Sequence, residues 1–484
     1  SPLSSAGWRK NLRAPDRSSH QGVSLTLTAF QHAKLRDCLF SADGMEQVAV
    51  GLCGRLNHPA AHKLLLYEVH PVPVDAYVER SPLHVTWRTE WMVPLLEKPM
   101  LKAPSNIKFH THPGGNVRFS QQDDESDRQL FPSLHGWIDD DAWHGSAIML
   151  PDGRLFGRTV GKHGGFNPFE KVSVFGDDLL VWEHGGSSGA LPGFAQRHSQ
   201  LFGQATTTLL RRMSVAVVGC SGTGSFVIEL LARLGVGRII LIDPDHVEEK
   251  NLNRILNTSQ TDAEKARAKV DVLGDAVKRM GLGTVIESYA DNICDSAAAA
   301  NAAASADVLF GCTDKHESRL TLNKLATFYL LPYFDLGVRA DADGTGNVSY
   351  VGGMVHYIQP GRSSLISRGA IDLDIATAEY TKRTNPTRYE QHLGEKYIRG
   401  VQENRPAVIS LNAQASAYAV NEFLARVHPF RAEPNRLYAR TAFDLMNGLL
   451  VSSGEEEFPA CEVLAKYVGR GYMHPLLDTP SLER

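Results

Sequence analysis

The chain has 484 residues with a formal net charge of -4, and 43% of its residues are hydrophobic and 21% charged. This length exceeds what one ordinary core holds and predicts two domains, and the nearly balanced charge gives no sign of nucleic-acid binding. No apolar run reaches the roughly 18 residues that a membrane-spanning helix needs. The six cysteines lie far apart without a CxxC pair, which favours a reducing cytoplasm.

Four regions are predicted along the chain. Residues 1–20 are polar and rich in Ser, Arg and Pro, which predicts a flexible N-terminus. Residues 21–165 mix helix and strand signals, as expected of an α+β domain. Residues 166–195 contain the glycine-rich run Gly185–Gly189 and are predicted to be a linker. Residues 196–484 then form a second domain.

The second domain begins with a pattern of strand, glycine turn, helix and strand. Its segments are Val215–Val218, Gly219–Gly224, Phe226–Leu234 and Arg238–Ile242. This βαβ unit predicts a doubly wound, Rossmann-like α/β fold. A later apolar strand, Val308–Phe310, stops just before Asp314, which places an acid where open parallel sheets bind ligands. Farther along, a mobile loop is predicted over Gly361–Arg399 and a helix over Ala407–Val427.

The strongest local signal is the spacing HxHx(7)SxxD, carried by His110, His112, Ser120 and Asp123. Two imidazoles two residues apart on an extended strand point to one face, and a carboxylate from a following helix completes three metal ligands with a fourth position open. Upstream, Glu46 opens an apolar strand, and its carboxylate is a candidate to accept a proton beside the metal.

Each fragment of this motif also has an ordinary explanation. An HxH pair alone is typical of surface or core histidines, and Ser120 with Asp123 has the spacing of a helix capping box. Asp124 is a rival ligand one position away. The complete set, with the upstream glutamate, favours a zinc site.

With these residues, the stretch from about Leu25 to Val160 resembles the JAMM (MPN, JAB) metalloproteases. The resemblance implies that the zinc ligands are His110, His112 and Asp123. It also implies that Glu46 acts as catalytic acid and base and that Ser120 stabilises the oxyanion. The activity implied is hydrolysis of peptide or isopeptide bonds.

The glycine loop of the second domain follows a strand and opens a helix, with Gly219, Ser221, Gly222 and Gly224 as its characteristic residues. Backbone N–H groups and the helix dipole at such a turn can meet phosphates. Asp243 ends the second strand and suits a ribose, which keeps a nicotinamide-dependent dehydrogenase as an alternative.

Charged residues beyond this loop separate the two alternatives. Attack on the α-phosphate of ATP needs cations around the triphosphate and an acid to hold Mg²⁺, whereas hydride transfer needs neither. Arg254, Lys269 and Asp314 supply these groups. Lys269 also has the ordinary explanation of a solvated helix face, and Asp314 that of a residue that ends a strand.

The pattern over about Arg197–Val427 resembles the ThiF-like adenylating enzymes, which include the ubiquitin-activating enzymes. The family motif is matched by Asp243, Asp245, Val247, Asn251, Leu252, Arg254, Cys312, Thr313 and Asp314. The resemblance implies that Asp243 contacts the ribose of ATP and that Asp314 holds magnesium. It implies phosphate contacts by Asn251, Arg254 and Lys269. Arg197 stands where this family often supplies an arginine to the neighbouring subunit's nucleotide, which implies a homodimer.

Two features depart from the family pattern. Ser221 replaces the usual middle glycine, and the paired CxxC motifs that hold structural zinc in many relatives are missing, so the second domain is expected to be zinc-free. Cys461 is the only cysteine after Asp314. It is a candidate thioester acceptor or a buried structural cysteine, and the acidic residues around it would raise its pKa and disfavour the thiolate.

Both resemblances point to the C-terminus of a small ubiquitin-like protein as the substrate. The second domain would adenylate it with ATP and Mg²⁺, and the first would use zinc to trim a precursor or to remove an attached carrier. Sulfur-carrier activation, a non-catalytic docking platform and a dehydrogenase remain as alternatives. A ubiquitin-conjugating-type enzyme is a further expected partner. A bacterial-style pathway and a role in antiviral defence are implied by resemblance alone.

Overall fold

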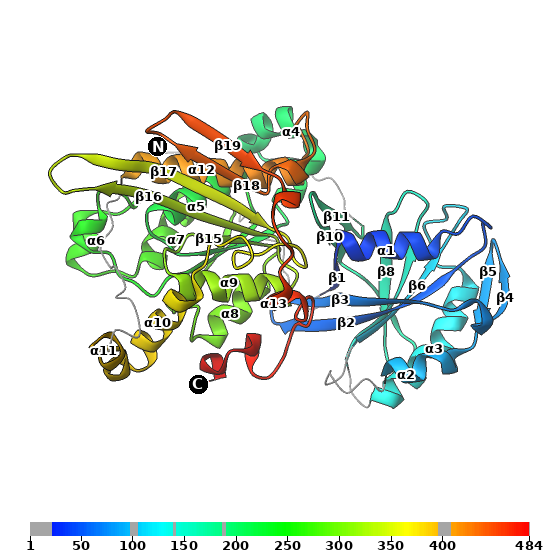
Figure 1. The fold of residues 1–484 in the computed structure, drawn as a ribbon. Helices are drawn as coiled ribbons and strands as arrows, with labels where there is room; N and C mark the ends of the chain where they lie inside the picture. Colours follow the sequence, from blue (N-terminus) through cyan, green and yellow to red (C-terminus); the bar gives the residue numbers. More distant parts are fainter. Residues whose placement is uncertain (1–21, 97–104, 139–141, 186–189, 395–407, 484) are drawn as a thin grey trace, which may run out of the picture.

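The computed structural model describes residues 22–96, 105–138, 142–185, 190–394 and 408–483. Two β-sheets dominate it, and the units built on them, here called the first unit (22–185) and the second unit (190–483), lie side by side in Figure 1. The predicted flexible N-terminus lies outside the described residues.

The first unit is built on a nine-stranded sheet of order β11-β10-β1-β3-β2-β6-β7-β8-β9. Its strands are β1 (Val23–Thr28), β2 (Val48–His58), β3 (Ala61–Pro71), β6 (Ser105–Thr111), β7 (His144–Met149), β8 (Leu155–Val160), β9 (Phe166–Pro168), β10 (Lys171–Phe175) and β11 (Leu179–Glu183). The other elements are the hairpin of β4 (Tyr77–Ser81) and β5 (His84–Trp87) and the helices α1 (Ala29–Leu39), α2 (Val93–Leu96) and α3 (Gln121–Ile138). Helix α1 begins at a capping box between Thr28 and Gln31, which satisfies backbone donors at its first turn.

The end of the first unit differs from the predicted linker over residues 166–195. Strands β9, β10 and β11 fall in this range, and all three belong to the first sheet. β10 pairs in parallel with β1 and antiparallel with β11. These strands have only three to five residues each, which is too short for a clear alternating pattern. β9 pairs with the preceding β8, and β11 pairs with β10. β10 joins the rest of the sheet through β1, at the start of the unit, so this long-range pairing rather than local propensity places β10 and β11 in the sheet.

The second unit contains an eight-stranded sheet of order β14-β13-β12-β15-β16-β17-β18-β19. Its strands are β12 (Ser214–Val218), β13 (Arg238–Ile242), β14 (Val285–Tyr289), β15 (Val308–Gly311), β16 (Tyr333–Ala342), β17 (Val348–Ile358), β18 (Arg440–Asp444) and β19 (Leu449–Ser453). The first five are parallel, and the last three add antiparallel pairs. Strand order reverses between β12 and β15, and this switch point is where doubly wound sheets bind ligands.

Helices cover the sheet of the second unit. They are α4 (Gln196–Leu210), α5 (Gly222–Leu234), α6 (Gln260–Glu264), α7 (Lys269–Met280), α8 (Ala297–Ala304), α9 (His316–Phe328), α10 (Leu373–Thr384), α11 (Pro386–Gly394), α12 (Ile409–Val427) and α13 (Glu462–Ala465). The predicted helix over Ala407–Val427 corresponds to α12. The segment predicted as a loop over Gly361–Arg399 instead contains α10 and α11, and Asp372 caps α10 by accepting from the backbone N–H groups of Asp374 and Ile375.

The two units are joined by buried contacts at the amino end of the second sheet. Lys63 on β3 donates to the carbonyl of Ala304 at 3.0 Å and also to that of Ala306. Lys171 on β10 lies 2.5 Å from the carboxylate of Asp307. An apolar cluster of the second unit also includes residues of the β2–β3 hairpin, namely Leu56 and Leu65. The first unit therefore packs on the second through its own sheet.

The C-terminal segment returns to the first unit. Gly471 forms a parallel bridge with Arg55 of β2, and a Cβ atom on Gly54 would lie 2.2 Å from the carbonyl oxygen of Gly469. Arg470 lies over the ring of Tyr67, with 4.0 Å between Cζ and the ring centroid. Only glycine at position 54 permits this close approach of the two backbones.

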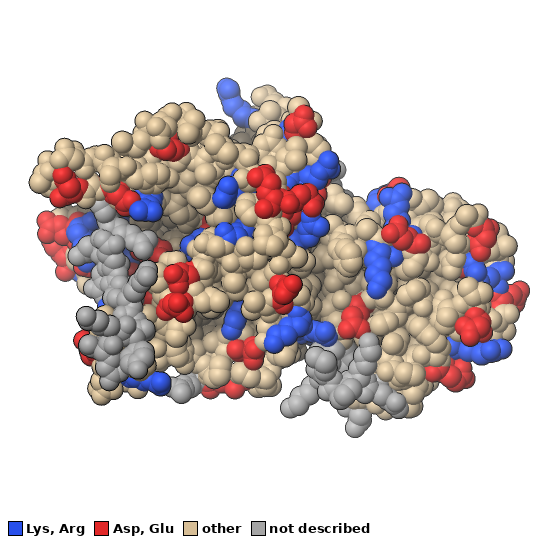
Figure 2. Space-filling model, viewed as in Figure 1, with Lys and Arg blue, Asp and Glu red and all other residues tan. Residues whose placement is uncertain are grey.

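The molecular surface carries both signs of charge. On the face shown in Figure 2, Lys and Arg side chains are intermixed with Asp and Glu over both units, in line with the net charge of -4. Within the described ranges, no helix has the length and apolar character required to cross a membrane.

Candidate functional site

The first unit brings His110, His112 and Asp123 together. His110 lies on β6 and His112 directly follows it, while Asp123 lies in the first turn of α3. The Nε2 atom of His110 is 2.9 Å from Asp123 Oδ1, and that of His112 is 3.4 Å from Asp123 Oδ2. One potential ligand atom from each residue lies within 4.8 Å of the others, and no second group of this kind occurs among the described residues.

A capping box orients the Asp123 carboxylate. The Ser120 hydroxyl and backbone N–H both donate to Asp123 Oδ2 at 2.7 Å, and Asp123 N–H donates back to Ser120 Oγ at 3.1 Å. Asp123 can therefore cap the helix and bind a metal at the same time, because its Oδ2 accepts from Ser120 while its Oδ1 faces His110. Burial would raise the pKa of Asp123, but the contacts with His110 and His112 outweigh it and hold the pKa well below its ordinary value.

The two histidines have the features of metal ligands. His110 is 2% exposed, and neither of its ring nitrogens has a hydrogen bond of acceptable geometry. Burial lowers its pKa, which favours the neutral ring that a metal requires. The Nδ1 atom of His112 contacts the carbonyl of Asn116 at 2.9 Å, a partner that leaves Nε2 directed at Asp123. This donor set of two imidazoles and one carboxylate fits Zn²⁺.

Glu46 lies next to this cluster. Strands β2 and β6 are antiparallel with Val48 opposite His110, and Glu46 and His112 each lie two residues beyond this pair. The Glu46 side chain is 6% exposed. Burial is the main cause that raises its pKa to about 7, and the charge of His112 acts in the opposite direction. A carboxyl with this pKa can both accept and return a proton near neutral pH.

Asp124, the rival ligand, is directed elsewhere. Its carboxylate accepts a hydrogen bond from Arg158 at 2.5 Å. The geometry therefore favours Asp123 as the third ligand.

The second unit places its glycine loop at the switch point of the sheet. Gly219 follows β12 with a φ of +93°, and a Cβ atom there would lie 2.5 Å from the carbonyl of Cys312, at the end of β15. A Cβ atom on Gly224 would lie 1.8 Å from the carbonyl of Gly219. Ser221 is the N-cap of α5, and its side chain makes no capping hydrogen bond. The tight turn leaves the first N–H groups of α5 available for an anion.

Asp243 and Lys269 form a buried charged pair beside this loop. Asp243 accepts hydrogen bonds from the backbone N–H groups of Cys220 at 2.6 Å and Asp245 at 2.9 Å. Burial raises its pKa, and the charge of Lys269 opposes that effect. Lys269 Nζ lies 3.9 Å from Asp243 and 2.8 Å from Asp245. Lys269 is only 5% exposed, so the expectation of a solvated helix face is wrong for this residue.

The other expected nucleotide residues differ in their surroundings. Asn251 is buried and caps its own turn, where its Oδ1 accepts from Glu248 N–H at 3.1 Å. Arg254 is half-buried and donates to the carbonyl of Lys250 at 2.7 Å. Asp314 is exposed just after β15. Arg197 is exposed on α4, and no contact among the described residues links it to the glycine loop.

One residue of this site carried no recognisable signal in the sequence. Asn412 on α12 is 3% exposed. A Cβ atom on Gly222 would lie only 2.2 Å from the side-chain amide nitrogen of Asn412. On the same helix, Ser416 donates to the carbonyl of Thr223 at 2.9 Å. Helix α12 thus supports the start of α5 from a position nearly two hundred residues later in the chain. No local motif around Asn412 indicates this contact.

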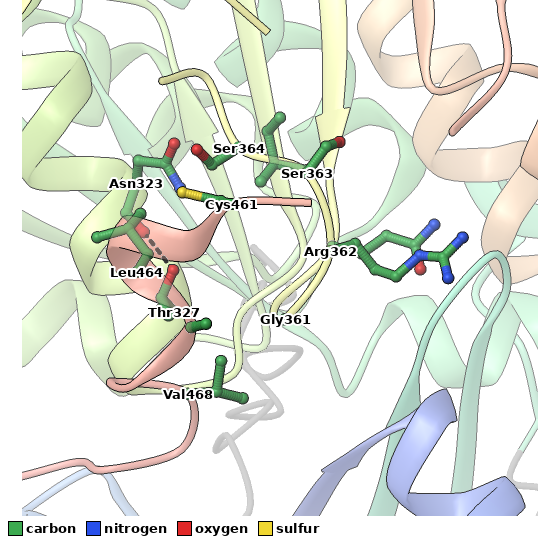
Figure 3. Close-up of a pocket in the computed structure, with 12 residues that line it drawn as sticks. Asn323, Thr327, Gly361, Arg362, Ser363, Ser364, Cys461, Leu464 and Val468 are labelled. Atoms are coloured by element: carbon green, nitrogen blue, oxygen red, sulfur yellow. Dashed lines mark hydrogen bonds between the residues drawn. The ribbon is translucent and has the colours of Figure 1, made fainter. Parts of the chain in front are cut away.

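Cys461 lies away from the nucleotide-type site. It is 6% exposed and belongs to an apolar cluster. In Figure 3 its sulfur points toward Asn323 in a small cavity of about 10 Å³, which also borders Ile358. Ile358 pairs with Tyr333 at the start of β16. The cavity therefore lies at the amino ends of the parallel strands, whereas Asp314 lies at their carboxyl ends. Cys461 therefore does not lie next to the glycine loop, Lys269 or Asp314.

Comparisons with known proteins match part of the second unit to a family. Residues 195–377 match the ThiF family. The chain is 30% identical over 165 residues to ubiquitin-like modifier-activating enzyme 5 of Bombyx mori, a match covering 32% of this chain and 39% of that protein. The enzyme of the same name from Arabidopsis thaliana is 29% identical over 174 residues, with 32% and 37% covered. The chain thus spans about two fifths of the length of these relatives.

Solved structures give a weaker likeness. The crystal structure of E. coli MccB with ATP has a TM-score of 0.42 at 20% identity and covers 56% of this chain and 74% of that one. That of PaaA has a TM-score of 0.40 at 15% identity, with 57% and 88% covered. The family match, together with the doubly wound sheet, shows that residues 195–377 form a ThiF-family domain with a Rossmann-like fold. This confirms the predicted class for that part of the chain. The JAMM resemblance of the first unit remains a prediction.

Proposed function

We propose that the second unit uses ATP to adenylate the C-terminal carboxylate of a ubiquitin-like protein. The observation that carries this proposal is the meeting of the glycine loop, Lys269 and the strand end before Asp314 at the switch point of a ThiF-family domain. The relatives named above are ubiquitin-like modifier-activating enzymes, which supports a protein carboxylate as the substrate. The ThiF match also favours adenylation over the dehydrogenase alternative.

The chemistry follows from the groups at this edge of the sheet. A carboxylate oxygen of the carrier attacks the α-phosphorus of ATP, the bond to the pyrophosphate oxygen breaks, and an acyl-adenylate and pyrophosphate result. Lys269 and Arg254 are the cations that we expect to face the triphosphate, and the N–H groups of the glycine loop supply further donors. Asp314 is exposed at its strand end, so its carboxylate is accessible to Mg²⁺.

The test is ATP–pyrophosphate exchange by the purified protein with a candidate ubiquitin-like partner. Wild type and Asp341→Ala should exchange label to the same extent, because Asp341 is an acid on β16 that pairs with Arg339. Asp314→Ala should lose exchange by at least about 100-fold if it holds the metal at the transition state. Equal exchange by Asp314→Ala and the control would contradict the assigned role. No exchange with any carrier would contradict the function.

The homodimer proposal rests on Arg197, and subunit mixing tests it. Arg197→Ala and Asp314→Ala should each be inactive alone. In a mixed dimer, one site would combine an intact Asp314 with an intact Arg197 from the other subunit, so part of the exchange should return. Absence of recovery in a mixture shown to contain mixed dimers would contradict the assignment of Arg197 to a neighbouring site.

We also propose that the first unit hydrolyses a peptide or isopeptide bond of the same carrier. The observation that supports it is the convergence of His110, His112 and Asp123 next to the buried Glu46. When bound there, Zn²⁺ would supply Lewis acidity. Glu46 accepts the proton of the attacking water and returns it to the departing amine. Ser120 now donates to Asp123, so its hydroxyl must reorient to stabilise an oxyanion.

Two measurements test this second function. Metal analysis of the dialysed protein should give one zinc per chain in wild type and in Asp152→Asn, an exposed turn residue, and far less in Asp123→Asn. Cleavage assays with the precursor and the conjugated form of the carrier then separate maturation from deconjugation. Protein without zinc would favour the docking-platform alternative, and zinc-loaded protein that cuts neither form would contradict hydrolysis.

The fate of the adenylate distinguishes the two pathways that share this chemistry. Conjugation predicts transfer of the carrier to an amine, with a ubiquitin-conjugating-type enzyme as a further partner. Sulfur-carrier activation predicts a thiocarboxylate when a sulfur donor is present. Mass analysis of the carrier C-terminus after reaction with each acceptor identifies which product forms.

A further inference from the structure

A buried arginine lies behind the metal-ligand cluster. Arg158 on β8 is 7% exposed. Its guanidinium lies between the rings of Phe119 and Phe166, with Cζ 3.7 Å from each ring centroid. A planar guanidinium held between two aromatic faces is restricted in both position and orientation.

The same guanidinium binds two carboxylates of α3. Its Nη1 donates to Asp124 Oδ1 at 2.5 Å, and its Nη2 and Nε donate to Asp127 Oδ2 at 2.7 and 3.2 Å. The other oxygen of Asp127 pairs with Lys108. Lys108 precedes His110 by two residues on β6, so both side chains point to the same face of that strand. The network therefore joins β6, α3 and β8 directly beneath the metal ligands.

The network also fixes both ends of the segment that carries Ser120 and Asp123. Phe119, which stacks on Arg158, directly precedes Ser120, and Asp124, which Arg158 binds, directly follows Asp123. The ring of Phe119 in turn lies 6.2 Å from that of His110. The position of this segment relative to β6 thus depends on the side chain of Arg158. Among the described residues, Arg158 makes no direct contact with His110, His112 or Asp123.

We propose that Arg158 is the positioning residue of the metal site: it holds Asp123 against His110 and His112 and keeps Asp124 out of the ligand set. This inference rests on the hydrolytic function proposed above. Within the network, the buried Arg158 and Lys108 contact Asp124 and Asp127, and the exposed Arg128 also lies 3.9 Å from Asp124. The role assigned to Arg158 rests on its geometry, so a lysine at position 158 cannot replace the forked, stacked guanidinium.

The test measures zinc affinity by competition with a chromophoric chelator and the visible spectrum of the cobalt-substituted protein. Arg158→Gln and Arg158→Lys should bind zinc about 10–100-fold more weakly, the usual effect of removing a group that orients a metal ligand. Their cobalt spectra should shift, because the carboxylate geometry changes. The matched control is Arg154→Gln, an exposed arginine just before β8 that pairs with Asp152, and it should equal wild type in both measurements.

Asp124→Asn keeps the inference testable if the Arg158 variants unfold. It removes one partner of the guanidinium at a partly exposed position and should weaken zinc binding while the stoichiometry stays at one. Loss of stoichiometric zinc in Asp124→Asn would instead make Asp124 a ligand and overturn the inference. Wild-type affinity and spectra in Arg158→Lys would also overturn it. These outcomes differ from failure of the proposed function itself, in which wild type would bind no zinc.

Discussion

Glu46 and His112 each lie two residues beyond the last pair of the antiparallel strands β2 and β6, Val48 and His110, and the charge of His112 acts on the Glu46 carboxyl. They come from positions 66 residues apart in the chain. This relationship places a carboxyl with a pKa raised to about 7, chiefly by burial, beside three candidate metal ligands. We therefore expect Glu46 to transfer protons and the other three residues to bind the metal.

Glu46→Gln should therefore separate metal binding from hydrolysis. The variant should keep one zinc per chain, because Glu46 is not among the three ligands. Its hydrolytic rate should fall by about 100- to 10,000-fold, the usual contribution of a general acid or base. Zinc analysis and a cleavage assay on the same preparation check this. Glu90→Gln, a substitution of an exposed acid in the same unit, serves as control. Loss of zinc in Glu46→Gln would make it a ligand.

Lys269→Met should impair the adenylation site, because it removes the cation that lies within 4 Å of both Asp243 and Asp245. We expect exchange of pyrophosphate to fall by about 100-fold or more and the free energy of unfolding to fall by about 1–3 kcal/mol. Lys278→Met on the same helix is the matched control, since Lys278 is 62% exposed in its side chain. Similar exchange rates in the two variants would remove Lys269 from the nucleotide site.

Cys461→Ser should leave ATP–pyrophosphate exchange unchanged, because Cys461 borders a cavity at the opposite edge of the sheet from Asp314. The cost should appear in stability, at about 1–3 kcal/mol for a hydroxyl placed in an apolar cluster. Exchange and urea unfolding of both proteins check this. A carrier adduct that wild type forms, that a thiol reagent releases and that Cys461→Ser lacks would restore the thioester role and require a conformational change.

Lys63 should make stability depend on pH. Burial lowers its pKa from 10.5 to about 7, and Asp307 opposes this, while Lys171 and Arg238 lower it further. Between about pH 7 and 10.5 the unfolded chain therefore holds a proton that the folded chain lacks, so the free energy of unfolding rises with pH by up to about 1.4 kcal/mol per unit.

Urea unfolding at pH 7 and pH 9 measures this effect as a difference between proteins. The stability of wild type relative to Lys63→Met should increase by about 2 kcal/mol between the two values. The stability of wild type relative to Lys34→Met, which removes an exposed lysine of α1, should be the same at both pH values. A constant difference for Lys63→Met as well would mean that Lys63 remains charged in the folded protein.

Gly54→Ala should loosen the C-terminal segment from the first unit. The added Cβ atom would lie 2.2 Å from the carbonyl oxygen of Gly469, and because this neighbour is backbone, the segment must move. We expect a loss of about 1–3 kcal/mol and faster proteolysis after residue 469. Gly136→Ala on α3 is the control: its Cβ atom meets nothing within 4 Å, and it should stabilise by about 0.5–1 kcal/mol. Unchanged proteolysis in Gly54→Ala would contradict this contact.

The sequence by itself determined the features that depend on neighbours along the chain. The glycine loop, the acid at the end of β13 and the HxHx(7)SxxD spacing are local patterns, and the geometry of a strand or of a helix start decides how their residues lie. For this reason the ThiF-type fold and the cluster of His110, His112 and Asp123 could be predicted from residue types and spacing.

Only the tertiary structure decided what depends on contacts between distant segments. Strand β10, with β11 beside it, joins the sheet through the distant β1, so a stretch resembling a linker became part of the first unit. Burial of Lys269 against Asp243, support of Gly222 by Asn412, and the location of Cys461 also depend on packing. Local propensity carries no information about such partners, because burial and pairing are properties of the assembled sheet.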